Sequence, residues 1–97
     1  MRSALLQYSY GEVFGPLQQA CRKKGYSIVR FDARAGVLKA SKSKFFGKPI
    51  EIEMRVERLD EQITKINVTA SSFKISPGSS VLENEEEKLV ETIYKYF

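Results

Sequence analysis

Apolar and polar residues alternate along the middle of the chain, a pattern typical of strands with one buried face. The alternation is strictest in IEIEMRV (residues 50–56) and continues in TKINVTA (64–70). Three further segments carry strand-forming residues: SALLQY (3–8), YSIVRF (26–31) and VLKASKS (37–43). Turn residues separate these segments, so the pattern predicts five strands, the last four in an antiparallel meander.

Two segments instead repeat their apolar residues at helical spacing. The first begins at Ser9–Glu12, whose S-x-x-E pattern is typical of a capping box, and ends at Gly25. Because proline fits the first turn of a helix and kinks its interior, we expect a separate first turn and a main helix from Pro16. The second helix is predicted to open at the N-x-x-E pattern Asn84–Glu87. Its apolar face then comprises Leu89, Val90, Ile93, Tyr96 and Phe97.

The predicted order of elements is β-α-β-β-β-β-α, which indicates an α+β fold in a single domain over residues 1–97. Each helix has one apolar stripe to bury, and the outward strand positions are polar. We therefore expect both helices to pack on one face of a five-stranded antiparallel sheet. Pairing Ala40 with Ile52 across the intervening turn places Lys39 opposite Glu53 on the outer face.

The stretch YSYGEVFGPLQQACRKKGYSIVRFDARAGVLKAS (8–41) combines a capped helix, a Gly-Tyr step into a strand and an Asp- and Gly-containing turn. With the order of elements along the whole chain, it resembles the TATA-binding-protein-like or helix-grip fold. This fold includes Bet v 1-like and START lipid-binding domains and BamC-like small bacterial domains. The resemblance implies one helix-grip-like domain and carries over no functional residues, because the fold has no common active site.

Three departures from these relatives narrow what the resemblance implies. The chain is shorter than Bet v 1-like carriers, which leaves little room for a large cavity. It lacks the lipidated N-terminal cysteine of BamC. Charges of both signs on the outer sheet face argue against the DNA contact made by TATA-binding proteins. These outer positions are Lys39, Glu51, Glu53, Arg55, Glu57, Lys65, Asn67 and Thr69.

The composition removes most catalytic chemistry. The chain has no histidine, so Ser-His and Cys-His pairs and zinc sites of the Cys/His type are excluded. Cys21 is the single cysteine, which rules out an internal disulfide, and we expect it to be a small buried hydrophobe with no disulfide-linked partner. We therefore expect a non-enzymatic protein without a cofactor or a metal site.

Charge is unevenly distributed: residues 1–48 hold ten basic and two acidic side chains, whereas residues 49–97 hold six and ten. Lysines and aromatics gather in KASKSKFFGKP (39–49), at the predicted tip between two strands. Near it we expect the end of the first helix, which gives a candidate surface for nucleic acid or an anionic membrane. The acidic run 85–87 would neutralise part of this surface. The residues of the candidate anion-binding surface are Arg22, Lys23, Lys24, Lys42, Lys44, Phe45, Phe46, Lys48 and Lys74.

The first of three hypotheses for the function is a protein-interaction or scaffold domain, with another protein as its partner. The alternative is a small apolar ligand held between the sheet and the C-terminal helix, and the second alternative is the anionic partner described above. No signal peptide or membrane-spanning run is present, so a cytoplasmic protein is expected. The candidate lining of the apolar site is Ile52, Met54, Ile66, Val68, Leu89 and Ile93.

Overall fold

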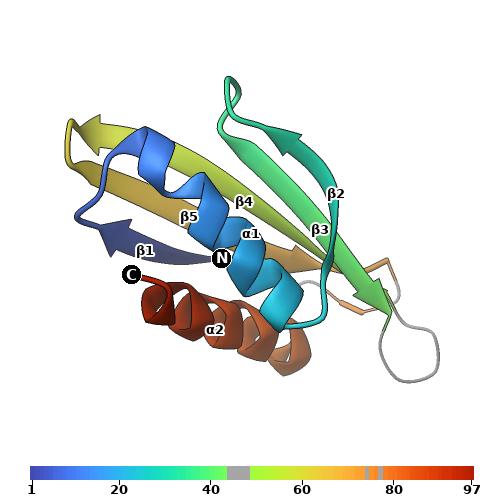
Figure 1. Ribbon diagram of the computed structural model, residues 1–97. Coiled ribbons are helices and arrows are strands. Elements are labelled where there is room, and N and C mark those ends of the chain that lie inside the picture. Colours follow the sequence, from blue (N-terminus) through green and yellow to red (C-terminus); the bar gives the residue numbers. More distant parts are fainter. Residues whose placement is uncertain (44–48, 74, 77) are drawn as a thin grey trace.

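A computed structural model describes residues 1–43, 49–73, 75–76 and 78–97. The elements follow the predicted order and form one antiparallel sheet with two helices, an α+β fold (Figure 1). A short 3₁₀ turn, η1, precedes the first helix. The bounds are β1 Arg2–Leu6, η1 Tyr10–Glu12, α1 Phe14–Lys23, β2 Ser27–Asp32, β3 Val37–Ser43, β4 Pro49–Asp60, β5 Ile63–Ser71 and α2 Ser80–Lys95.

The strands lie in the order β1-β5-β4-β3-β2, which makes β1 and β2 the two edges of the sheet. The predicted register between β3 and β4 is confirmed, since Ala40 pairs with Ile52 and Lys39 with Glu53. β1 pairs antiparallel with β5, the strand most distant from it in sequence among the five. Its first residue, Arg2, lies opposite Val68.

Both helices lie on the same face of the sheet, as expected (Figure 1). α2 packs against β5 and β1, α1 packs against β2, and the two helices contact each other. The inward positions of β4 are buried against this layer: Ile50, Ile52, Met54 and Val56. The opposite face of the sheet carries the alternating polar residues, as is common for antiparallel sheets.

The first helix begins two residues earlier than predicted. The box at Ser9 caps η1, where Glu12 accepts a hydrogen bond from the Ser9 backbone at 3.1 Å. The separate first turn is therefore confirmed, but α1 begins at Phe14 rather than at Pro16. Pro16 is the third helical residue, and the first four N–H groups of a helix have no intrahelical partner, so its missing N–H costs no hydrogen bond there.

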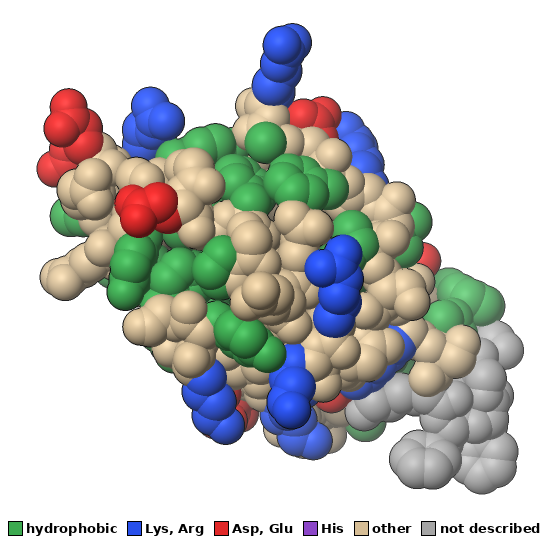
Figure 2. All heavy atoms as spheres, in the orientation of Figure 1, with side chains coloured by type: hydrophobic (Ala, Val, Ile, Leu, Met, Phe, Trp, Pro, Cys, Tyr) green, Lys and Arg blue, Asp and Glu red, His purple; other side chains and the backbone are tan. Residues whose placement is uncertain are grey.

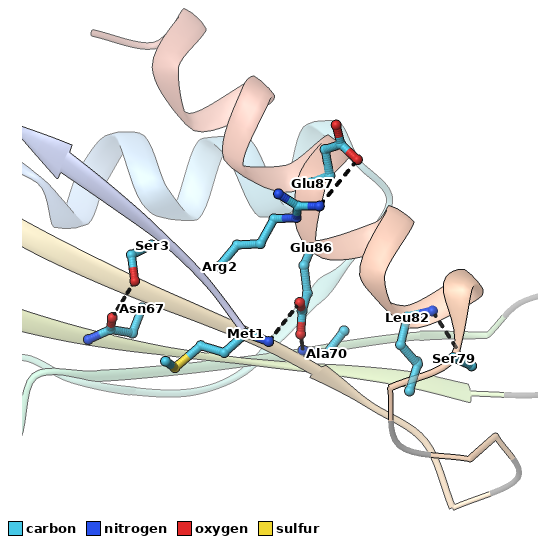
Figure 3. Close-up of polar contacts among 9 residues, drawn as sticks. All are labelled: Met1, Arg2, Ser3, Asn67, Ala70, Ser79, Leu82, Glu86 and Glu87. Atoms are coloured by element: carbon cyan, nitrogen blue, oxygen red, sulfur yellow. Dashed lines mark hydrogen bonds and ion pairs between the residues drawn. The ribbon is translucent and has the colours of Figure 1, made fainter.

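The second helix also begins earlier, at Ser80 rather than near Asn84. Its cap is Ser79, whose side chain accepts a hydrogen bond from the Leu82 backbone at 3.3 Å (Figure 3). Serine is among the favoured caps, and this one leaves Asn84 inside the first turns of the helix. Leu82 then joins the buried core.

Gly36, at the turn between β2 and β3, packs closely against β4 and η1, and this close approach can be tested by substitution. Its φ is +67°, and an added Cβ would lie 2.6 Å from the Val56 carbonyl oxygen and 2.9 Å from the Tyr10 hydroxyl. We expect Gly36→Ala to lower the free energy of unfolding by at least about 2 kcal/mol, because backbone strain and a backbone clash add. Gly25→Ala, at φ +85° but in open space, should cost only about 1 kcal/mol. Urea unfolding compares the two, and equal losses would contradict the clash.

Candidate functional site

An edge groove lies between β1 and α2. Figure 3 shows Arg2 of β1 beside Glu87 of α2, two of the residues that line it. It has a volume of about 370 Å³. The strand side is short, and the helix side offers Val90 and Tyr94 together with the carboxylates of Glu87 and Glu91. Tyr94 is half exposed. The groove is lined by Met1, Arg2, Ser3, Glu87, Val90, Glu91 and Tyr94.

Two residues that line the helix side of the edge groove, Glu87 and Glu91, belong to a row of acidic residues along α2. Glu83, Glu87 and Glu91 are four residues apart, so they lie one above another on α2, and all three are exposed. Arg2 is the basic side chain on the strand side, and its guanidinium lies 3.6 Å from the Glu87 carboxylate. Both side chains are about half exposed, so this pair contributes less than about 1 kcal/mol.

Glu86 differs from its exposed neighbours, because it is buried and anchors α2 to the sheet (Figure 3). Its carboxylate accepts a hydrogen bond from the Ala70 backbone at 2.8 Å. Its other oxygen lies 3.0 Å from the Met1 ammonium. The buried charge is thus hydrogen-bonded and paired, which is the usual condition for a carboxylate in a core.

A second hollow, of about 220 Å³, lies on the outer face over β3 and β4. Its walls bring Lys39 next to Glu51 and Glu53. Glu53 Oε1 is screened from solvent and receives no hydrogen bond from the described residues, although the Arg55 guanidinium lies 2.8 Å away. The lining residues thus carry one positive and two negative charges, and the charge of Glu53 is paired with Arg55.

Lys42, one of the predicted anion-binding residues, points into the fold instead of outward. Its ammonium lies 2.8 Å from the Glu85 carboxylate, 3.1 Å from the Lys24 carbonyl oxygen and 4.4 Å above the Tyr26 ring. The Tyr26 hydroxyl donates to the same carboxylate at 3.1 Å. Burial, followed by the Glu85 charge, raises the pKa of Tyr26 well above its usual range. The neutralisation suggested by the acidic run is therefore present at Lys42.

The other predicted anion-binding residues are only partly placed. Arg22 and Lys23 are exposed at the end of α1, and Lys24 is half-buried. Lys42 lies beside the end of α1, 3.1 Å from the Lys24 carbonyl oxygen, but its charge is paired with Glu85. On the face drawn in Figure 2, the described lysine and arginine side chains are dispersed and do not form one patch. The anion surface stays a prediction. Five of its members lie outside the described residues: Lys44, Phe45, Phe46, Lys48 and Lys74.

The predicted apolar lining forms part of the packed core. Each of its six residues is at most 1% exposed, and all belong to one cluster that also contains residues of α1 and β1. These side chains therefore fill the space between the sheet and α2. They are Ile52, Met54, Ile66, Val68, Leu89 and Ile93.

Nucleophilic and metal-binding groups contribute little to the described surface. Cys21 is fully buried, and burial raises the pKa of its thiol from 9.0 to about 12. Within the described ranges, histidine, cysteine and carboxylate side chains nowhere gather in a group of three or more that would suit a metal ion. The helices described have neither the length nor the apolar character required to cross a bilayer.

Sequence reasoning missed the edge groove. Glu83, Glu87 and Glu91 recur at the spacing of one helix face, which is readable from sequence once the helix is known to begin at Ser80. With a start near Asn84, the first of these falls outside the helix. That β1 lies beside α2 depends on the pairing of β1 with β5, for which the local sequence has no signal.

The Lys42–Glu85 pair can be tested by a double-mutant cycle. Glu85→Gln leaves the Lys42 ammonium mostly buried without its counter-charge, so we expect the free energy of unfolding to fall by about 2–3 kcal/mol. Adding Lys42→Met should recover most of that loss, because the unpaired charge is removed. Glu83→Gln, on the exposed face, is the matched control and should change stability by less than about 0.5 kcal/mol. Losses that simply add in the double variant would contradict the pairing.

The buried thiol predicts a loss of stability at alkaline pH. The folded-state pKa of Cys21 is about 12 and its ordinary value is 9.0, so the thiol's contribution is complete below pH 9 and declines as pH rises toward 12. Between pH 8 and 11 the wild-type protein should lose roughly 2–3 kcal/mol more than Cys21→Ala. Urea unfolding across this range measures the difference. Parallel pH profiles for the two proteins would show that the thiol is not responsible.

No family model matches the chain, and no curated protein matches it. One similar solved structure is a chain of the crystal structure of the adenylate sensor from AMP-activated protein kinase in complex with 5-aminoimidazole-4-carboxamide 1-β-D-ribofuranotide (ZMP). The TM-score is 0.75, the identity is 11%, and the match covers 94% of each chain. This likeness supports the α+β fold with an antiparallel sheet, and the helix-grip resemblance stays a prediction.

Proposed function

We propose that this chain is a non-enzymatic domain that binds another protein. The observation that carries the proposal is the filled interior beneath α2. The candidate lining residues are at most 1% exposed, so an apolar ligand there would have to displace core side chains at a cost of several kcal/mol. Binding at the surface requires no such rearrangement, and the described surface offers an open sheet edge and several hollows, among them the edge groove and the outer hollow over β3 and β4.

The reactive groups of the chain also favour binding over catalysis. The one thiol is buried with a pKa of about 12, so little thiolate forms at neutral pH. Histidine is absent from the sequence. The buried carboxylate of Glu86 is held by the Ala70 backbone and the Met1 ammonium, which leaves it unsuited to proton transfer.

A small ligand on the outer face is the second candidate. The adenylate sensor with a similar fold was crystallised with the nucleotide ZMP, and the outer hollow over β3 and β4 has room for part of such a molecule. Its charges disfavour a phosphate, since Glu51 and Glu53 face a single Lys39. Thermal unfolding with about 1 mM ZMP or AMP tests this candidate. For a Kd of about 1 μM this concentration is about a thousand times the Kd, so binding should raise the melting temperature clearly.

A cross-linking scan tests the protein-binding proposal. A photoreactive amino acid is placed at Ser3 on β1, Gln19 on α1 or Thr69 on the outer face, all of which are exposed. In an extract of the source cells we expect one adduct of discrete mass at one of these positions, and excess unlabelled domain should abolish it. The absence of any saturable protein adduct, with ZMP raising the melting temperature, would replace the proposal by the second candidate.

A further inference from the structure

We propose that the β1 edge binds an extended basic segment of a partner protein as a sixth strand of the sheet. This inference rests on the proposed function and names the surface and the chemistry of the partner. β1 lies at the edge of the sheet and pairs on one side only, with β5. Among the described residues, no backbone hydrogen bond joins its other side to a turn or loop. Alternate backbone groups of β1 are therefore directed outward, ready to pair with an added strand.

The opposite edge of the sheet is protected, which is why the inference concerns β1. β2 pairs with β3 through a register shift between Ile28 and Arg30, so Val29 is extra in the ladder. A bulge of this kind interrupts the row of hydrogen-bonding groups and discourages pairing with another chain. β1 pairs with β5 in continuous register from Arg2 to Leu6 and has no such interruption.

The edge groove specifies the side chains of the added strand. Every second residue of that strand would point toward α2, at a repeat of about 6.7 Å. Glu83, Glu87 and Glu91 repeat along α2 every four residues, or about 6 Å. Lysine or arginine at alternate positions would thus meet successive carboxylates. Their aliphatic stems would lie on Val90 and Tyr94, which line the groove together with Glu87 and Glu91.

The remaining side chains of the added strand would point to the outer face of the sheet, away from α2. Leu5 lies on that surface at 60% exposure, paired across the ladder with Lys65. A β-branched residue beside Leu5 would cover it, as cross-strand apolar pairs do. The favoured segment therefore alternates basic and β-branched residues.

Charge also decides between a basic segment and a second copy of this chain. Two β1 edges paired about a two-fold axis would bring two acidic stripes together, three carboxylates from each copy. Arg2 offsets only one carboxylate in each stripe. A basic partner is attracted by the same charges, so we infer a partner rather than self-association.

The test uses the peptide acetyl-Lys-Val-Lys-Val-Lys-Val-amide, titrated into the ¹⁵N-labelled domain. We expect amide shifts along β1 and at residues 87–94, with hydrogen exchange slowed in β1. In two further peptides the backbone nitrogens of the three lysines, or of the three valines, are methylated. Each peptide thereby loses the N–H groups along one edge of the strand. One of them should lose at least about tenfold in affinity and the other should retain binding. Equal binding of all three peptides would overturn the proposal, because it would show attraction by charge alone.

Charge variants provide the second arm of the test. Exposed ion pairs change affinity by up to about fivefold each, so Glu87→Lys/Glu91→Lys should weaken binding by about tenfold or more. Asp60→Lys/Glu61→Lys, at the exposed turn between β4 and β5, reverses the same number of charges elsewhere and should leave binding unchanged. A dimer in sedimentation with protected β1 amides would identify a second copy as the occupant and would also overturn the proposal.

The two proposals fail in different ways. A saturable protein adduct at Gln19 or Thr69, without peptide binding at β1, would keep the protein-binding function and remove this site. Peptide binding at β1, without a protein adduct at any scanned position, would remove the proposed function instead. An adduct at Ser3 that the unmethylated peptide displaces would support both.

Discussion

Two helices can cover only one face of a five-stranded sheet, and this limit shapes the rest of the molecule. The covered face must be apolar, and the strands supply it by alternation, most regularly in β4. The uncovered face must be polar, which explains its mixed lysine, arginine and glutamate residues without any ligand. The sheet also ends in two edge strands, β1 and β2, each of which pairs with one neighbouring strand only.

The same alternation accounts for the buried charge at Lys42. Leu38, Ala40 and Lys42 occupy successive inward positions of β3, so the period of two carries the lysine to the helix side of the sheet. An unpaired ammonium there would be costly, and Glu85 of α2 supplies the counter-charge. Glu86, the next residue, anchors α2 to the end of β5. Adjacent carboxylates thus fix one helix at two places.

The sequence predicted the strands and their order along the chain from the apolar alternation. It also predicted the β3–β4 register, because a one-residue shift would expose every apolar side chain. It predicted the helix starts less well. Ser79 was a better cap than Asn84, and the choice depended on whether Leu82 reached the core. For the site, the period of two along β3 places Lys42 on the inward face with Leu38 and Ala40, whereas its place in the lysine-rich segment 39–49 predicts an outward side chain. The edge groove depended on the β1–β5 pairing, which joins distant segments and leaves no local pattern.

That pairing also has a consequence for the order of folding. Arg2 meets Val68, so the chain closes a loop of 66 residues before β1 finds its place. The strands from β2 to β5 pair with neighbours that are close in sequence, so they form their contacts sooner. β1 is therefore the first strand to be synthesised and the last able to pair. Until it docks, the outer side of β5 is itself a vacant edge, where a β1 strand from another molecule would fit equally well and exchange between chains would begin.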